Sequence, residues 1–232
     1  MPISRRRFLG CAAGASAAGL AGSFAWARTS FRNPAVAPGC KLVVSGPGCT
    51  LPESAAGYES ALSSAGVHYQ RASFQSLTPA RTIILPAFEC VDQGGALQLR
   101  DYLERGSTVL FESGAAFSAP GEFSIHRSLI KRVFGLGLHS PIGLWDSADS
   151  FRRSPYVDYR WPLAVKVRDF SRIVPLDATG GDAIAWFHDL PVSARRRVGN
   201  GTLVFLGSPL GPHLLSGDRE ACRWLAAFCS SC

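Results

Sequence analysis

The stretch Ser107–Phe117, STVLFESGAAF, runs from an apolar strand into a turn of small residues, with Ser113 at the bend. A serine at such a bend is either a nucleophile presented at the end of a strand or a small turn residue. The preceding residues 93–106, QGGALQLRDYLERG, predict a helix that Gly106 ends. The inward face of that helix is expected to carry Leu97, Leu99, Tyr102 and Leu103.

Strands and helices alternate on the amino-terminal side of this stretch. CKLVVSG is a short apolar strand, PESAAGYESALSSAG has helical spacing with Pro52 in its first turn, and VHYQRAS is a second strand. RTIILPAFE is a continuous apolar run, which is typical of a strand buried on both faces. This alternation predicts parallel βαβ units and an α/β fold with a doubly wound, mostly parallel sheet.

The carboxyl-terminal half has a different pattern. Prolines interrupt the β-forming residues 154–177, which predicts irregular strands. Residues 183–209 predict a β-meander with a tight hairpin turn at 199–201, so we expect a meander added to the main sheet. Residues 218–229 predict a closing helix with Asp218 as its N-cap. Its inward face is expected to consist of Ala221, Trp224, Leu225 and Phe228.

The amino terminus has the pattern of a twin-arginine signal peptide. Arg5 and Arg6 precede an acid-free run rich in Ala and Gly, which ends in the small-x-small motif Ala25-Trp26-Ala27. This pattern predicts export by the twin-arginine route to the periplasm or the cell exterior. The alternative to cleavage is that the signal segment stays in place as a membrane anchor. No other contact with the membrane is expected. The expected organisation is a signal peptide over 1–27, a linker over 28–39 and a single domain over 40–232.

Cysteines form the next pattern, and six lie outside the signal segment: Cys40, Cys49, Cys90, Cys222, Cys229 and Cys232. An even number of cysteines in an exported protein permits disulfides. Cys49 and Cys90 are expected to meet at the carboxyl edge of the sheet. Cys40 is expected near Cys229 or Cys232 at the opposite edge. A zinc site at the terminal C-x-x-C is the alternative, but structural zinc sites usually need a second such pair, so no metal is expected.

Two phrases, LRDYLERGSTVLFESG at 99–114 and RRRVGNGTLVFLGSPLG at 195–211, carry a similarity to a known family. Together with the order of strands and helices, they resemble the class I glutamine amidotransferase-like superfamily over most of residues 40–228. The resemblance implies a flavodoxin-like sheet. In active members it also implies an oxyanion-binding glycine loop, a cysteine nucleophile and a His-Pro-Glu triplet.

This chain departs from the family pattern at all three places. Leu85-Pro86 is followed by Ala87, Phe88 and Glu89 where glycines are expected. Ser113 stands near the position of the cysteine, and Ser208-Pro209-Leu210 stands where His-Pro-Glu is expected. A serine hydroxyl needs an adjacent base before it can attack, and Ser208 cannot act as one. The resemblance therefore implies a degenerate, non-catalytic member of the superfamily.

The expected function is that of a periplasmic binding or assembly module. Its partner would be an unknown periplasmic protein or a small polar, sugar-like ligand at the carboxyl edge of the sheet. The candidate ligand-binding residues are Phe88, Glu89, Glu112, Ser113, Ser208 and His213. The alternative function is a serine hydrolase in which His213 is the base for Ser113 and either Glu112 or Glu89 orients His213.

Other features of the chain carry weaker signals. Trp145, Trp161 and Trp186 are candidates for a sugar-stacking surface, although aromatic residues of this kind are more often part of the core. The sequence contains no nucleotide-binding motif, so no cofactor is expected. The formal net charge of +7 includes three arginines of the signal segment and is no argument for nucleic-acid binding.

Overall fold

The computed structural model describes residues 36–46, 48, 51–144, 155–169, 171–177 and 180–231. The main sheet has nine strands in the order β2-β1-β3-β4-β11-β10-β9-β6-β7. The strands from β2 to β11 in that order are parallel: β2 (Tyr69–Ser73), β1 (Cys40–Ser45), β3 (Thr82–Phe88), β4 (Thr108–Ser113) and β11 (Gly201–Leu206). The rest pair antiparallel: β10 (Leu190–Val198), β9 (Asp182–Phe187), β6 (Tyr156–Tyr159) and β7 (Val165–Arg168).

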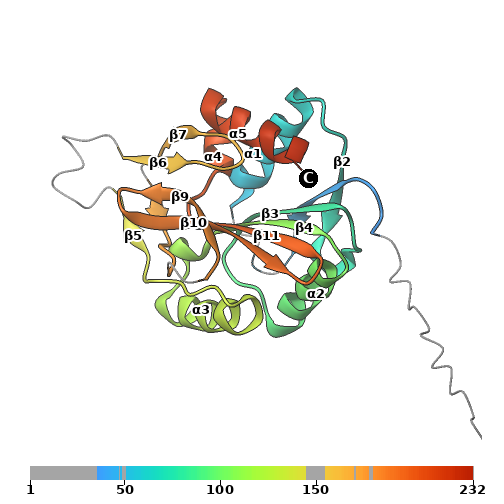
Figure 1. Ribbon diagram of the computed structural model, residues 1–232, viewed down its shortest axis with the longest axis horizontal. Helices are drawn as coiled ribbons and strands as arrows, with labels where there is room; N and C mark the ends of the chain where they lie inside the picture. Colours follow the sequence, from blue (N-terminus) through green and yellow to red (C-terminus); the bar gives the residue numbers. More distant parts are fainter. Residues whose placement is uncertain are drawn as a thin grey trace, which may run out of the picture. The chain divides into compact units, whose positions relative to one another are not determined.

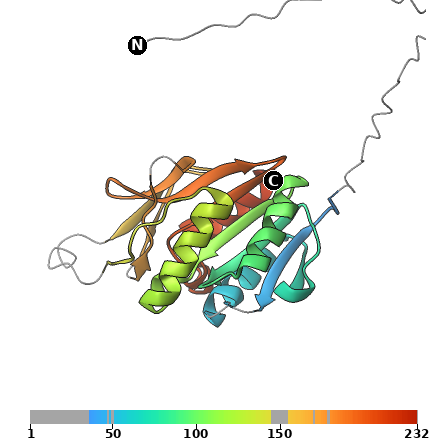
Figure 2. The same ribbon diagram turned by 90° about the horizontal axis from the view of Figure 1, so that it is seen from below.

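Helices cover both faces of this sheet (Figure 1). On one face lie α1 (Pro52–Ser64), α4 (Gly211–Leu215) and α5 (Arg219–Ser231). On the other face α2 (Gln93–Glu104) and α3 (Pro120–Phe134) lie side by side (Figure 2). A separate two-stranded sheet pairs β5 (Ile142–Gly143) with β8 (Arg172–Ile173). Two short 3₁₀ turns, η1 (Phe74–Ser76) and η2 (Ala115–Phe117), follow β2 and β4.

The predicted fold class is wrong in its architecture. We expected a doubly wound, flavodoxin-like, mostly parallel sheet with an added meander, whereas the strands form one continuous mixed sheet. The reason is the hairpin turn between β10 and β11. Because β10 pairs antiparallel with β11 from Val198–Gly201 to Ser193–Leu206, the later strands extend the same sheet.

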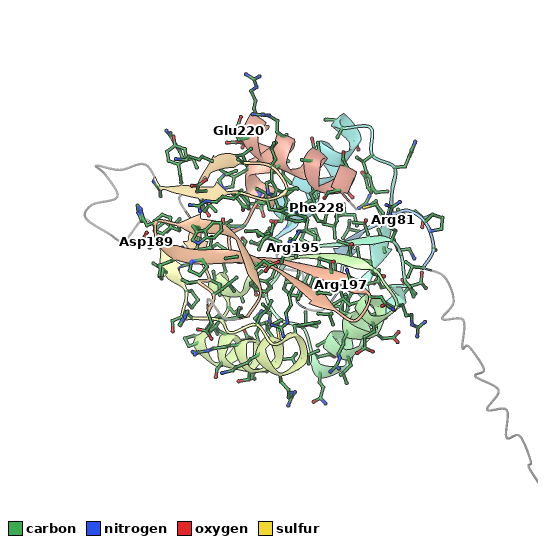
Figure 3. All side chains as sticks on the ribbon, viewed as in Figure 1. Arg81, Asp189, Arg195, Arg197, Glu220 and Phe228 are labelled. Carbon is green, nitrogen blue, oxygen red and sulfur yellow. The ribbon has the colours of Figure 1, made fainter. Side chains whose placement is uncertain are left out.

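The closing helix α5 is built as its sequence predicts. Asp218 Oδ1 accepts hydrogen bonds from the backbone N–H groups of Glu220 and Ala221, at 2.9 and 3.0 Å. The expected inward residues Ala221, Trp224, Leu225 and Phe228 are all buried. Phe228 points toward the sheet, and Glu220 lies on the outer side of the helix (Figure 3).

The predicted inward face of α2 is wrong at one position. Leu99, Tyr102 and Leu103 are buried, but Leu97 is 48% exposed. The helix begins at Gln93 because the Asp92 side chain accepts a hydrogen bond from the N–H of Gly95 at 2.6 Å. Leu97 lies two positions before the buried Leu99, which places it on the opposite face of the helix, and four positions before Asp101, which shares its face. Leu97 therefore faces away from the sheet.

Predictions for the amino terminus fall outside the described residues. The predicted signal peptide, residues 1–27, and residues 28–35 of the predicted linker are not among them, and the structure gives the signal peptide no support. The described residues all belong to one compact unit, Asn33–Cys232. Within them, no helix combines the length and apolar character that crossing a membrane requires.

The predicted disulfides are also unsupported. Cys90 and Cys222 carry free thiols, and both are half-buried. Cys40 and Cys229 line the same pocket. Cys49 and Cys232 lie outside the described residues.

Candidate functional site

Glu112 lies near the end of β4 and is fully buried. Ser54 Oγ donates a hydrogen bond to its Oε1 at 2.8 Å, and the N–H of Gly211 donates to its Oε2 at 3.0 Å. A single carboxylate thus joins the first turn of α1 to the first residue of α4. The two helices are close there, because a Cβ at Gly57 would lie 1.9 Å from the carbonyl oxygen of Gly211.

The environment of Glu112 disfavours its charge. Burial raises the pKa of this carboxyl, and the hydrogen bonds that it accepts offset that effect only in part. Burial also raises the pKa of the neighbouring Tyr58 hydroxyl well above its ordinary value, with the charge of Glu112 adding to the effect. Glu112 is therefore a buried carboxyl that holds helices together, and a ligand in solvent has no contact with it.

Ser113 faces the opposite side of the sheet. Val109 and Phe111 belong to the apolar cluster under α2 and α3, and strand alternation places Ser113 on that same side. Ser113 is fully buried, and its Oγ accepts a hydrogen bond from the N–H of Ala115 at 3.3 Å. Glu112 and the helix that carries His213 lie on the other side. The structure therefore does not bring Ser113, His213 and Glu112 together as a serine hydrolase needs.

Ser208 belongs to a second buried polar cluster, centred on Asp169. Ser208 Oγ donates to Asp169 Oδ2 at 2.6 Å, and Ser171 donates to Asp169 Oδ1 through its Oγ at 2.6 Å and its N–H at 2.8 Å. His213 Nε2 lies 3.9 Å from Asp169 Oδ1, with 20% of its side chain exposed. The carboxylate thus stands between the serine and the histidine, which is the wrong order for a histidine that would deprotonate Ser208.

Asp169 was not among the candidate residues. Burial tends to raise its pKa, but the nearby His213 side chain and the hydrogen bonds from Ser171 and Ser208 together outweigh burial and hold the pKa below its ordinary value. A single aspartate after a strand is a common surface pattern, so nothing in the local sequence marks it as buried. Its role depends on contacts with residues 39 and 44 positions later in the chain, Ser208 and His213.

The remaining candidates are mostly part of the core. Phe88 is fully buried, with ring centroids 5.3 Å from Phe74 and 6.1 Å from Phe111. Glu89 is half-buried beside Gly114. Phe88 therefore offers no surface to a ligand at the carboxyl edge, because packing the aromatic cluster takes the space around its ring.

The tryptophan surface is also covered in part. The Arg160 guanidinium lies 4.3 Å from the ring centroid of Trp186, and the Arg195 guanidinium lies 5.0 Å from that of Trp161. Figure 3 labels Arg195 on β10, in the antiparallel part of the sheet. One face of each ring therefore already stacks on an arginine. Trp145 lies outside the described residues.

An open pocket lies between the start of α3 and the small β5–β8 sheet. Its volume is about 510 Å³. We call it the arginine pocket and define it by its polar wall: Ser118, Ser124, Arg127, Ser140 and Arg172. Among the described residues that line it, none is acidic. Sequence reasoning missed this pocket because its walls come from segments about fifty residues apart.

Metal binding has no support in the described part of the chain. No group of three or more His, Cys, Asp or Glu side chains there is placed to hold a metal ion. The arginine pocket, with its two guanidinium groups, would repel a cation.

Comparisons with known proteins give similarities of fold. No protein-family model and no curated protein matches the chain. An exo-β-1,4-mannosidase from Opitutaceae bacterium strain TAV5 matches with a TM-score of 0.60 and 16% identity, over 84% of this chain and 36% of its own. The cold-adapted β-galactosidase from Rahnella sp. R3 matches with a TM-score of 0.59 and 15% identity, over 84% of this chain and 31% of its own. A cytoplasmic protein of Salmonella typhimurium LT2 matches with a TM-score of 0.59 and 11% identity, over 82% of this chain and 98% of its own.

These comparisons contradict the resemblance to class I glutamine amidotransferases. Several solved structures that share the fold are named as glycosidases, and no family model supports the predicted membership. The amidotransferase-like phrases consist of helix, strand and turn residues that other α/β proteins use for the same local geometry. The chain spans about a third of the length of these glycosidases, and at such identities the likeness concerns the fold alone.

Proposed function

We propose that this protein is a non-catalytic binding module whose ligand occupies the arginine pocket. The observation that carries this proposal is the contrast between the two neighbouring regions. The hydroxyl and carboxyl groups at the carboxyl edge of the sheet are buried and bonded to one another, whereas the arginine pocket is open to solvent. Pockets of a few hundred Å³ with a few converging polar groups are typical of small-molecule sites.

The absence of catalysis is supported by the geometry of Ser113. A nucleophile needs an accessible oxygen and a base within hydrogen-bond reach, roughly 3 Å. Ser113 is fully buried, and its oxygen accepts a hydrogen bond from the backbone of η2. The test is intact-mass analysis after exposure to a fluorophosphonate, with Ser113→Ala as the control. An adduct on the native chain that disappears in Ser113→Ala would overturn the proposal.

Binding itself is tested by thermal unfolding of the full chain in the presence of small anionic, neutral and cationic compounds. A ligand of the folded state raises the unfolding temperature in proportion to its saturation. The variant Phe123→Ala removes an apolar side chain from the pocket wall and should reduce that stabilisation for any occupant. A response that this variant leaves unchanged would place the ligand elsewhere.

The location and the partner also belong to the proposal. We place the module in the periplasm or outside the cell, with an unknown periplasmic protein or a small polar ligand as its partner. The pattern of the amino-terminal sequence supports this location. Cell fractionation with an antibody against the chain tests it, and recovery in the cytoplasmic fraction alone would refute it.

A further inference from the structure

We propose that the arginine pocket binds the phosphate group of a small organic phosphate ester. This inference rests on the proposed function and adds the chemical class of the ligand. It is carried by a juxtaposition of two cationic and three hydroxyl side chains around one open pocket.

The two guanidinium groups come from separate elements. Arg172 belongs to β8, and its Nη1 donates a hydrogen bond to the carbonyl oxygen of Ala116 at 3.4 Å, which holds the side chain against one wall. Arg127 belongs to α3 and is exposed. A guanidinium offers a planar set of N–H donors that matches phosphate oxygens, and two of them favour a group with more than one negative charge.

The hydroxyls of Ser124 and Ser140 add donors from other directions, whereas the Ser118 hydroxyl already donates to the carbonyl oxygen of Glu89 at 3.5 Å. Ser118 precedes α3, Ser124 lies on it one turn before Arg127, and Ser140 lies in the segment before β5. A carboxylate presents two oxygens in one plane, whereas the phosphate group of an ester presents three terminal oxygens in a tetrahedral arrangement. Donors distributed around the pocket therefore fit a phosphate group better than a carboxylate.

Helix α3 contributes in the same sense but is not sufficient alone. Its first residue, Pro120, lines the pocket, so the positive end of the helix dipole lies at the site. Glu122 in the first turn opposes this effect, because its Oε2 accepts a hydrogen bond from the N–H of Ala119 at 3.3 Å. Glu122 does not line the pocket, so the two arginines determine the charge of the pocket.

The size of the pocket indicates an organic ester. A volume of about 510 Å³ exceeds what a single phosphate group fills. The lining of the pocket also includes Phe123 and Pro141. Apolar side chains of this kind pack against the carbon part of a ligand, while the guanidinium groups bind its phosphate.

The test is isothermal titration calorimetry of the full chain with phenyl phosphate, inorganic phosphate, benzoate and methyl glucoside. We expect phenyl phosphate to bind most tightly and benzoate at least about tenfold more weakly. Arg127→Gln and Arg172→Gln should each weaken phenyl phosphate about tenfold. Lys131→Gln removes the same charge from an exposed position of α3 outside the pocket and should leave affinity nearly unchanged.

A second pair of variants keeps the test independent of Arg172, whose side chain also contacts the backbone. Ser124→Asp places a negative charge inside the pocket and should abolish binding of phenyl phosphate. Ser128→Asp places the same charge one turn further along α3, where it lines a neighbouring groove, and should weaken binding much less. Circular dichroism checks that each variant is folded.

The outcomes separate this inference from the proposed function. Binding of methyl glucoside alone, weakened by Phe123→Ala, would overturn the phosphate assignment and leave the binding module standing. Equal affinity for inorganic phosphate would overturn the ester and make free phosphate the ligand. Phenyl phosphate binding that the arginine and Ser124 variants leave intact would overturn the site. Failure of every compound to bind would overturn both proposals.

Discussion

Replacing Glu112 tests whether this buried carboxylate holds α1 and α4 to the sheet. Glu112→Leu leaves the Ser54 hydroxyl and the Gly211 N–H buried without their acceptor. Each buried unsatisfied donor costs about 1–3 kcal/mol, so the free energy of unfolding should fall by about 2–6 kcal/mol. Removing the cost of burying a charge offsets part of this loss, so we expect a net decrease of about 3 kcal/mol.

Glu112→Gln should be far milder than Glu112→Leu. The amide oxygen still accepts from the Gly211 N–H, and the Ser54 hydroxyl can reverse its role and accept from the amide nitrogen. We expect a loss below about 1 kcal/mol. In the Glu112→Leu background, Ser54→Ala should cost less than it does in the native chain, because the unsatisfied hydroxyl is removed.

The pH dependence gives a second readout for Glu112. Its pKa is raised in the folded state, so the unfolded chain loses its proton first as the pH rises. The free energy of unfolding should therefore fall as the pH rises from about 4.3 through the raised pKa, and Glu112→Gln should lack this component. Urea unfolding at several pH values measures both effects. A Glu112→Leu variant as stable as the native chain at pH 7 would refute the reasoning.

Three further predictions concern stability and thiol chemistry. Asp169→Leu should lower the free energy of unfolding, measured in urea, by about 2–5 kcal/mol. Because the folded-state pKa of Asp169 is lowered, the native chain should lose stability as the pH falls below about 3.9. An Asp169→Leu variant with the same acid sensitivity as the native chain would argue against this role. Gly57→Ala should destabilise the protein by about 2 kcal/mol or more, since its Cβ would lie 1.9 Å from a carbonyl oxygen of α4. The control Gly121→Ala, whose Cβ meets open space, should be neutral or stabilising. Equal effects of the two variants in thermal unfolding would contradict the close packing of α1 and α4. Cys90 and Cys222 should react with iodoacetamide without reductant, slowly at pH 7 and faster at higher pH, because burial raises both thiol pKa values. Mass analysis that finds either thiol alkylated only after reduction would show a disulfide.

Local patterns in the sequence predicted most elements but only part of the candidate site. The alternation of Ile, Val and Leu runs with helical stretches located β1, β3 and β4, and the hairpin signal at 199–201 located the turn between β10 and β11. Hydrophobic spacing failed at Leu97, because an apolar residue on an outward position is common in proteins. For the same reason, candidates chosen by their position after strands, such as Phe88, proved to be core.

The sequence by itself determined most strands and helices and the apolar face of α5, because these depend on residues a few positions apart and on a cap such as Asp218. Only the tertiary structure decided that the sheet is mixed and that Glu112 and Asp169 are buried. It alone placed Arg127 and Arg172 around one pocket. The physical reason is that burial, charge pairing and pocket shape arise from contacts between distant segments, which no local spacing records.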